Sequence, residues 1–535
     1  MPVATNSSDS EQQLLWPRLF ELLLILLVFF ALAGDPAPHQ NEPYYLCRLK
    51  HFWNLAWCAG DFYLDSADAH LMFVLAFGWI TKWLSLSATA WTGRIFVWTL
   101  LAWAWQRLSW RVVPKPLFAV LSAALWVVLI DRANLAGEWV VGGFESKCVA
   151  YVFVLAAIFE LISDRWNRVW LLLGAASAFH VLVGGWSVVV CAGVWLVDAK
   201  SRSIYSMRSM LPGLFGGGLL ALFGVLPALQ LTWHEAPDVV AEASRIYVFD
   251  RLPHHLSILT VPPDEVLRRL SRHGVLVVAL ALLTLINRRV RKATNTTQAV
   301  DSYDRLRLLN FFAWGSVALA ATGLAIELTL WTRPDLSAPL LKFYWFRLTD
   351  FAVPMATALN LAALIADAFA RRRAWAPAGL AATIIFLAVP LIYSVRQRYD
   401  NPVPPADSTV ASFDDWVDVC GWISDNTGPT SEFISPRMGQ SFKWRTGRRE
   451  VVTRKDIPQD AHSIVEWSER LHDIYYHEVD GQNVPVDSVA DLGTEHVRLM
   501  AEKYGADYVL ANRDPVLKLP TEYANNTYVV YRIQP

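Results

Sequence analysis

The chain contains little charge and few cysteines, and it lacks the common nucleotide and hydrolase motifs. Charged residues make up 18% of its 535 residues, against roughly 25% in average soluble chains. Its formal net charge of −1 gives no sign of a nucleic-acid partner. The five cysteines are scattered and form no metal motif, and no Walker A, GxSxG, HExxH or dinucleotide-binding motif occurs in a fitting context. These absences disfavour an ATP-driven pump and an ordinary hydrolase.

Long apolar runs fill much of the chain instead. Hydrophobic residues amount to 54%, and several runs approach the ~20 residues with which a helix crosses a hydrocarbon core ~30 Å thick. Because only helices and closed barrels satisfy every backbone group in lipid, these runs predict a polytopic α-helical membrane protein. The first run, from Trp16 to Gly34, is too long for the apolar part of a signal peptide, so we expect it to remain as the first transmembrane helix.

The positions of lysine and arginine predict how the helices are oriented. If residues 71–86 lie flat on the membrane and 90–106 form the second span, the short basic loops, such as Arg371–Arg373, all fall on one side. The positive-inside rule places that side, and the amino terminus, in the cytoplasm. We therefore predict about 11 transmembrane helices. The later spans are expected near 116–130, 148–163, 168–183, 185–198, 209–232, 273–287, 309–331, 346–368 and 376–394.

Composition divides the chain into three parts. Residues 1–15 are polar and predict a disordered cytoplasmic tail. Residues 16–398 are predicted to form the transmembrane domain, in which 35–89 make up a first external loop with surface-lying helices. The Pro-rich sequence NPVPPADS follows the last apolar run and indicates a domain edge. Beyond it, short apolar runs and frequent charge predict an extracytoplasmic α/β domain over 399–535.

Helix and strand patterns alternate within this last domain. FDDWVDVCGWISDNTG predicts an amphipathic helix that ends at Gly428. The basic stretch RMGQSFKWRTGRR favours a solvated loop and strand edge over a surface that contacts lipid headgroups. Strands are expected at 433–435, 450–453, 507–511 and 528–533, and further helices at 462–476 and 494–504.

The first external loop combines carboxylates with aromatic rings over residues 41–70. Glu42 is the first candidate for chemistry, because a carboxylate just outside the first transmembrane helix can act as a general base or bind a metal. A solvated loop acid is the alternative. Asp61 and Asp65 are secondary acidic candidates, although Asp65 could simply begin the next helix. The loop also holds two cysteines that could pair or remain free thiols, Cys47 and Cys58.

Later external loops carry further acids and cations. Glu138, Glu145 and Lys147 surround Gly142–Gly143, where backbone amides could approach an anion. Lys147 could neutralise a phosphate as a point charge, or it could be a snorkelling lysine at a helix start. The loops predicted to converge on the first external loop are 131–147, 233–272 and 332–347.

One arginine and three histidines complete the set of candidates. Arg347 lies where a loop meets a span, and its guanidinium could hold a lipid-linked phosphate through two hydrogen bonds; a plain interfacial anchor is the alternative. His180 ends an apolar run and is either a satisfied core residue or part of a polar site. His254 and His255 could complete a divalent metal site with Glu42 or Glu138, although adjacent histidines are a weak metal signal.

The layout resembles the GT-C superfamily of membrane glycosyltransferases. That superfamily includes protein O-mannosyltransferases, the lipid A aminoarabinose transferase and the catalytic subunits of oligosaccharyltransferases. Its members carry an acidic motif after the first helix, often Asp-Glu followed by Tyr, and Asn41-Glu42-Pro43-Tyr44 is similar, with Asn in place of the first acid. Surface-lying helices before the second span, Arg94 at the start of that span, Arg347 near a later span and an extracytoplasmic tail domain also match.

The resemblance implies a divergent bacterial member in the inner (cytoplasmic) membrane. Such an enzyme would transfer a hexose or pentose from a polyprenyl-phosphate-linked donor to a glycan, lipid or protein acceptor in the cell envelope. The resemblance assigns acid chemistry to Glu42, Glu138 and Glu145, and donor-phosphate binding to Lys147 and Arg347. Because Asn41 departs from the motif, a non-catalytic scaffold or sensor stays open. A transporter or flippase of a lipid-linked solute is the third reading, and it would use acids inside the spans, for which the candidates are Glu160 and Glu327.

Overall fold

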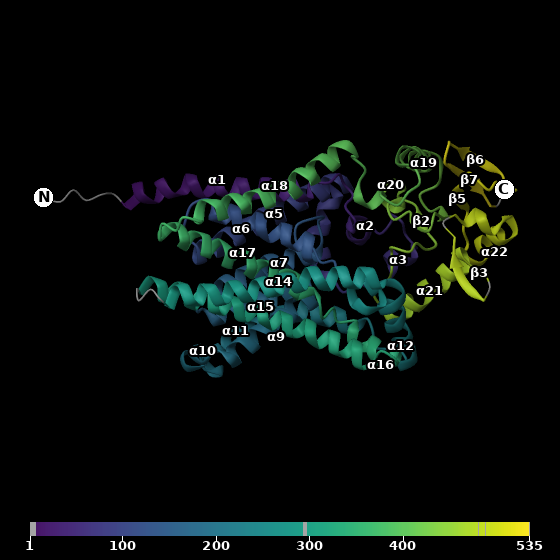
Figure 1. Cartoon of the computed structure of the whole chain (residues 1–535). Helices are drawn as coiled ribbons and strands as arrows, with labels where there is room; N and C mark the ends of the chain where they lie inside the picture. Colours follow the sequence, from purple (N-terminus) through teal and green to yellow (C-terminus); the bar gives the residue numbers. More distant parts are fainter. Residues whose placement is uncertain (1–6, 293–296, 480, 487, 534–535) are drawn as a thin grey trace.

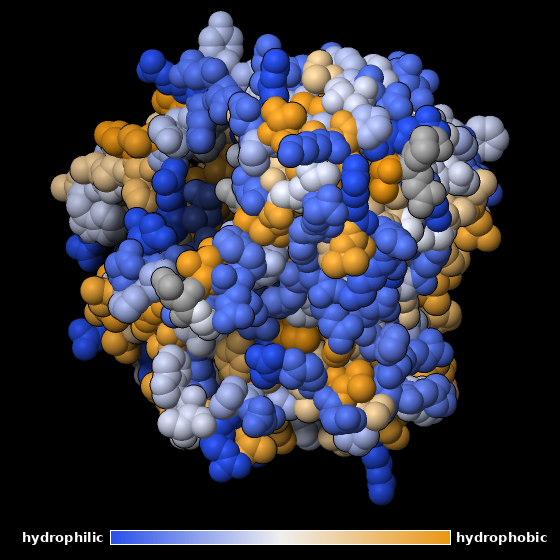
Figure 2. Space-filling model, turned by 90° about the vertical axis from the view of Figure 1, so that its right-hand side faces the viewer, coloured by the Kyte–Doolittle hydropathy of each residue, from blue (hydrophilic) through white to orange (hydrophobic). Residues whose placement is uncertain are grey.

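The computed structural model describes residues 7–292, 297–479, 481–486 and 488–533. Figure 1 shows a bundle of long helices with a smaller domain packed against one end, and the first helix begins at the opposite end. The smaller domain is formed by the C-terminal part of the chain. Figure 2 looks at that end of the molecule, where the face is mainly hydrophilic and is hollowed toward the left of the view.

Within the described residues, six helices are long and apolar enough to cross a membrane. Five of them bury less than 40% of their apolar window, whereas α17 buries 83%, so α17 is the central helix of the bundle. The outer helices expose apolar side chains, such as Phe215 at 71% and Phe223 at 59%, which suit contact with lipid. The six spans are Trp16–Ala33 in α1, Met207–Gln230 (α11), Pro263–Val290 in α14, Asp304–Thr329 in α15, Arg347–Ala370 (α17) and Ala376–Asp400 (α18).

Helices also form at the other predicted spans, and most of their residues are buried against α17 and its neighbours. Helix α8 approaches α11 so closely that a Cβ atom added at Gly174 would lie 2.1 Å from the carbonyl oxygen of Gly217. Which of these helices cross the bilayer, and hence the total of about 11, stays a prediction. They are α5 (Leu86–Val112), α6 (Phe118–Ala133), α7 (Ser146–Leu161), α8 (Trp166–Phe179) and α9 (Val181–Val197).

The amino-terminal helix α1 spans Ser7–Ala33, so it begins inside the stretch that we predicted to be a disordered tail. Polar composition does not prevent backbone hydrogen bonding, and the helix extends upstream of its apolar part. Residues 1–6 of that stretch lie outside the described residues.

Short helices gather at the end of the bundle that meets the C-terminal domain (Figure 1). In the segment 35–89, which the sequence predicts to be the first external loop, the apolar run after residue 70 is divided between α4 and the short helix η1. The elements of that loop are α2 (Glu42–Trp53), α3 (Phe62–Asp65), α4 (Leu71–Phe77) and η1 (Gly78–Lys82). The later loops hold α12 (Pro237–Arg245), η2 (Ile246–Arg251), α13 (Pro253–Leu256), η3 (Ile258–Thr260) and α16 (Pro334–Leu341), and α10 (Ala199–Ile204) lies elsewhere.

The C-terminal domain is an α/β domain, as the sequence predicted. Its five-stranded sheet has the order β2-β1-β5-β7-β6, in which β1 runs parallel to β2 and β5, and β7 is antiparallel to β5 and β6. Alternate side chains face opposite sides: Phe433 packs with α19 (Phe413–Asn426), whereas Ile434 packs with α21 (Ala461–Tyr475) and α22 (Thr494–Tyr504). The strands are β1 (Glu432–Ile434), β2 (Arg449–Glu450), β5 (Tyr508–Asn512), β6 (Thr521–Ala524) and β7 (Tyr528–Arg532).

Helices cover both faces of this sheet. The domain also contains a polar hairpin that the sequence analysis did not predict. That hairpin and β6 consist mostly of exposed residues without an apolar alternation, so the pattern that predicted the other strands is missing there. The helices are α19 (Phe413–Asn426), α20 (Phe442–Thr446), α21 (Ala461–Tyr475) and α22 (Thr494–Tyr504), with short η4 (Pro405–Asp407) and η5 (Val489–Leu492). The hairpin pairs β3 (Tyr476–Val479) with β4 (Gln482–Pro485).

Candidate active site

A cavity of about 740 Å³ lies where the helical bundle meets the C-terminal domain. Its walls come from the loop around Asn41, from the segment 137–147, from residues 243–255 and from the start of α17. The C-terminal domain closes it with residues of the segment 455–464. The cavity therefore draws on the first external loop and on all three loops that we expected to converge with it.

Most of the predicted site residues line this cavity. Helix ends at one face of the bundle bring them together: Glu145 directly precedes α7, Lys147 lies in its first turn, and Arg347 begins α17. The predicted residues found at the cavity are Glu138, Glu145, Lys147, His180, His254, His255 and Arg347.

The loop that carries Glu138 is held by a buried aspartate. Both carboxylate oxygens of Asp350, one helical turn after Arg347, accept hydrogen bonds from backbone amides of this loop. The donors are the amides of Leu135 at 2.6 Å, Ala136 at 2.8 Å and Glu138 at 3.3 Å. Asp350 thus orients the Glu138 loop, and His273 Nδ1 lies 3.8 Å from Asp350 Oδ1, so this acid inside a span is held by several partners.

Charges of opposite sign alternate across the cavity wall. Lys147 Nζ lies 3.6 Å from Glu138 Oε1 and 3.8 Å from Glu145 Oε2. Arg347 Nε lies 3.0 Å from Glu138 Oε2, and its Nη1 donates a hydrogen bond of 3.0 Å to Nε2 of His180. All five side chains are nearly buried. Water is largely excluded, so each charge acts strongly on its neighbours.

Glu145 differs from Glu138 in that neither of its carboxylate oxygens has a hydrogen-bond partner in the described part of the chain. Both of its oxygens, and Oε1 of Glu138, are buried and accept no hydrogen bond from a group in the described ranges at a normal geometry. Burial raises the pKa of Glu145, and the charge of Lys147 and the nearby Asn41 side chain lower it less, so the net shift is upward. A carboxylate with a raised pKa and free lone pairs is suited to accept a proton.

Three cations of the cavity were not among the predicted site residues, namely Arg251, Lys342 and Lys455. Arg251 comes from η2, and Lys455 comes from the C-terminal domain. The Arg251 guanidinium donates a hydrogen bond of 3.4 Å from Nη2 to the carbonyl oxygen of Lys455, so the two residues are neighbours. Arg251 lies in the loop sequence FDRLPHHLS, in which the sequence analysis named only the two histidines as candidates. No local pattern distinguishes Lys455, because its place depends on how the C-terminal domain docks.

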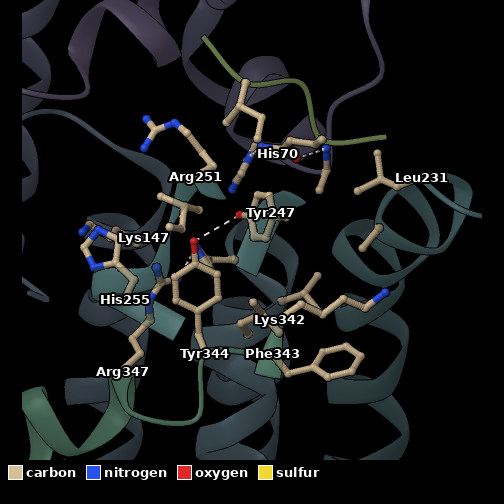
Figure 3. A pocket seen from close by; sticks show the side chains of 18 of the residues that line it. His70, Lys147, Leu231, Tyr247, Arg251, His255, Lys342, Phe343, Tyr344 and Arg347 are labelled. Atoms are coloured by element: carbon tan, nitrogen blue, oxygen red, sulfur yellow. Dashed lines mark hydrogen bonds between the residues drawn. The ribbon is translucent and has the colours of Figure 1, made fainter. Parts of the chain in front are cut away.

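The cavity has a polar side and an apolar side. Figure 3 shows Lys147, Arg251, His255 and Arg347 on one side and Leu231 across from them, with the Tyr247 and Tyr344 hydroxyls 3.1 Å apart between them. On the apolar side the cavity is also lined by residues of the membrane-spanning helix α11, namely Val225, Ala228 and Leu229. Such a cavity suits a ligand with an anionic head and a hydrocarbon chain.

Glu42 does not line the cavity. Its side chain is fully buried, and Arg94 binds it through two hydrogen bonds, Nε to Oε1 at 2.6 Å and Nη2 to Oε2 at 2.5 Å. The same oxygens accept hydrogen bonds from the backbone amides of His39 at 2.7 Å and Phe144 at 2.9 Å. Burial raises the pKa of Glu42, but Arg94 and these amides outweigh it, so the pKa is lowered. These contacts argue against the predicted role as general base or metal ligand.

Asp61 also has a structural position rather than one at the cavity. Its Oδ1 accepts from the amide of Leu64 at 3.0 Å, its Oδ2 accepts from the amide of Glu450 at 3.0 Å, and Lys443 Nζ lies 3.5 Å away. Lys443 is buried and also pairs with Asp456 at 2.8 Å and Glu450 at 2.9 Å. The basic stretch around Lys443 is therefore not the solvated loop that we expected, since this lysine ties the C-terminal domain to the first external loop.

Cys47 and Cys58 are free thiols, and both are buried. The disulfide that the sequence left open is therefore absent between these two described residues. Burial raises the pKa of both thiols, which keeps them protonated and unreactive at neutral pH.

Asp65 lies outside the cavity, with a half-exposed side chain that contacts Nε2 of His51 at 2.8 Å. We expect Asp65→Asn to change the free energy of unfolding by less than about 1 kcal/mol, because exposed ion pairs contribute little. It should also leave ligand binding at the cavity unchanged. Denaturant titration and a binding assay on the purified variant check both expectations, and a large loss of binding would return Asp65 to the list of site residues.

The described residues do not form the divalent metal site that the sequence left open for His254 and His255 with Glu42 or Glu138. His255 Nδ1 contacts the carbonyl oxygen of Ala136, and Glu42 lies outside the cavity. The carboxylates of Glu138 and Glu145 face Lys147 rather than the histidines. Throughout the described part of the chain, no group of three or more His, Cys, Asp or Glu side chains is arranged to hold a metal. The cavity is lined by five cations and two acids, which favours an anion.

Residues 414–474 match a protein-family model described as a domain of unknown function (DUF6798). No curated protein matches the chain. Among solved structures, the archaeal oligosaccharyltransferase AglB from Archaeoglobus fulgidus, in complex with an inhibitory peptide and a dolichol-phosphate, matches with 13% identity and a TM-score of 0.42, over 93% of this chain and 69% of that chain. The Archaeoglobus fulgidus oligosaccharyltransferase in its apo form matches with 13% identity and a TM-score of 0.42, over 92% and 69%. TM-scores below 0.5 establish neither a common fold nor a common activity.

Proposed function

We propose that this membrane protein is a glycosyltransferase that moves a sugar from a polyprenyl-phosphate-linked donor to an acceptor at the outer face of the membrane. The observation that carries the proposal is the cavity itself, in which buried cations and a free carboxylate face an apolar wall built partly by a membrane-spanning helix. The resemblance of the first-loop motif to GT-C enzymes agrees with this reading. In this proposal the amino terminus is cytoplasmic and the C-terminal domain lies outside.

The donor would bind with its phosphate on the polar side of the cavity. Lys147 and Arg347 lie at helix ends beside this side, and their charges would offset the charge that develops on the departing phosphate. The polyprenyl chain would lie along Val225 and Leu229 of α11 and pass from there into the bilayer. A lipid-linked donor needs no ATP at the outer surface, which agrees with the absence of nucleotide motifs in the sequence.

Glu145 would act as the general base. The acceptor's hydroxyl or amine proton would pass to the Glu145 carboxylate while the acceptor atom bonds to the anomeric carbon of the sugar. The bond between that carbon and the phosphate oxygen would break, and the polyprenyl phosphate would leave with the electron pair. Glu138, held between Lys147 and Arg347, would position both cations, so it is a positioning residue.

Both buried acids that a transporter would use, Glu160 and Glu327, have protein partners instead. Glu160 pairs with Arg165 at 3.2 Å and Arg168 at 3.7 Å at the end of its helix. Glu327 accepts hydrogen bonds from the hydroxyl of Ser257 at 2.6 Å and from backbone amides of the following residues, so it holds a loop in place. Neither acid is free to serve a solute path through the bundle.

Binding of polyprenyl phosphate tests the proposal. We expect the purified protein to bind it, and Arg347→Gln to lower the affinity by about tenfold or more, because a hydrogen bond to a charged group contributes about 1.5–3 kcal/mol. Glu42→Gln should bind as wild type does once its folded fraction is matched, since Glu42 lies outside the cavity. Absence of binding by the wild-type protein would remove the basis of the proposed function.

A further inference from the structure

The C-terminal domain supplies a fixed wall of the cavity. Several hydrogen bonds hold the segment 455–461 on the membrane domain. The Tyr44 hydroxyl donates to the carbonyl oxygen of Ile457 at 3.1 Å, the amide of Ala69 donates to the side chain of Gln459 at 2.9 Å, and the amide of Ala461 donates to the carbonyl oxygen of Leu231 at 3.1 Å. Lys455 is therefore placed at the cavity by several independent contacts.

Arg251 and Lys455 are the cations of the polar side without a carboxylate partner. Lys147 and Arg347 face Glu138 and Glu145, but within the described ranges neither Arg251 nor Lys455 forms an ion pair. The Arg251 side chain is 91% buried, and its Nε has no hydrogen-bond partner there. Asp456, next to Lys455 in the sequence, pairs with Lys443 instead, at 2.8 Å.

An unpaired cation with little access to water is costly, and Arg251 is buried while Lys455 is half-buried, so a site that keeps the two side by side is built for a ligand that neutralises them. Burial and the neighbouring cations lower the pKa of Lys455 to about 8 and that of Arg251 to about 10, as expected where positive charge is uncompensated. The four cations of the polar side exceed its two acids by two charges.

We propose that Arg251 and Lys455 form a clamp for a phosphate group that carries two negative charges, so that the C-terminal domain is part of the ligand site. The inference rests on the proposed function, which it deepens. A phosphate monoester on a polyprenyl chain and a polyprenyl diphosphate both supply this chemistry, whereas a phosphodiester carries one charge. If the ligand is the monoester, the clamp binds the departing polyprenyl phosphate more tightly than the donor diester. It would therefore stabilise the transition state of the transfer.

The test measures binding to the full chain in detergent micelles. We expect Lys455→Gln and Arg251→Gln each to lower the affinity for polyprenyl phosphate by about tenfold to a hundredfold, and Lys455→Arg to keep it. Lys518→Gln is the matched control, because Lys518 is an exposed lysine of the same domain, away from the cavity. Polyprenyl diphosphate is titrated in parallel, and the tighter of the two ligands identifies the source of the phosphate. The methyl ester of polyprenyl phosphate, with one charge, should bind more weakly than the dianion.

The outcomes separate the clamp from the proposed function. If Lys455→Gln and Arg251→Gln bind as wild type does while Arg347→Gln loses binding, the clamp is wrong and the proposed function stands. If wild type binds neither lipid, the proposed function fails, and the clamp fails with it. If the methyl ester binds as tightly as the dianion, the assignment of two charges is wrong. A melting temperature within a few degrees of wild type shows that each variant is folded.

Discussion

Replacing Glu145 by glutamine is expected to lower the rate of sugar transfer by about 10²- to 10⁴-fold, the usual contribution of a general base. Glutamine keeps the volume of the side chain but cannot accept the proton of the acceptor. Glu145 is the residue for this test because both of its oxygens are buried without a hydrogen bond from the described part of the chain, while it faces the cavity cations. The measurement is single-turnover transfer with a polyprenyl-phosphate-linked sugar as donor.

The pH dependence of the rate provides a check that a structural defect would not reproduce. Because the pKa of Glu145 is raised, the rate should rise with pH as its carboxylate loses its proton, and this acid limb should vanish in Glu145→Gln. A fall near pH 8 is expected as Lys455 loses its charge and releases the phosphate, and Lys455→Arg should shift that limb upward. The charged groups that act on Lys455 are Arg251, Lys147, Glu145, Asp456, His254 and His39.

Glu138→Gln serves as the matched control for Glu145→Gln. It removes a charge of the same sign, but Glu138 is already paired with Arg347 and Lys147, so its loss should weaken donor binding more than it slows transfer by the bound complex. If Glu145→Gln transfers sugar at the wild-type rate, Glu145 is not the base. If Glu138→Gln alone abolishes transfer at saturating donor, the two acids have exchanged roles.

Local patterns predicted the long apolar helices and the apolar strands, because each depends on short-range periodicity. Trp416, Val419, Cys420 and Ile423 recur at helical spacing, and all four are buried in α19. The domain edge followed from the Pro-rich stretch after residue 400. The number of membrane crossings cannot be predicted from apolar runs alone, because buried helices such as α7 and helices with exposed apolar faces such as α11 are both apolar.

The residues of the site could be predicted where they sit at helix ends, and not where a distant partner decides their role. Lys147 and Arg347 begin helices on the same face, so their convergence follows from topology. The sequence gives no sign that Arg94, near the start of α5, pairs with Glu42 in α2, a contact that argues against the predicted role of Glu42 as a base. Lys455 enters the cavity only through docking between domains.

Replacing Arg94 by methionine is expected to lower the free energy of unfolding by about 3–5 kcal/mol, because it leaves the Glu42 carboxylate buried without its cation. The pair joins three segments, since Glu42 also accepts from the amide of Phe144, and Arg94 Nη1 donates to the carbonyl oxygen of Asp35 at 2.6 Å. Denaturant titration in mixed micelles measures the change. Arg396→Met, at an exposed pair with Asp400, is the control and should cost less than about 1 kcal/mol.

The double variant decides whether Glu42 stabilises the fold or carries out chemistry. In Arg94→Met with Glu42→Gln, both charges are gone, so the protein should be more stable than Arg94→Met alone, with a coupling between the two sites of about 0.5–3 kcal/mol. Because the pKa of Glu42 is lowered in the folded protein, the stabilisation from this pair is complete above the unfolded pKa of Glu42 and is lost as the pH falls through the folded value. A double variant that is stable and still transfers sugar would show that Glu42 is a structural residue, whereas a stable double variant without activity would restore Glu42 as a catalytic candidate.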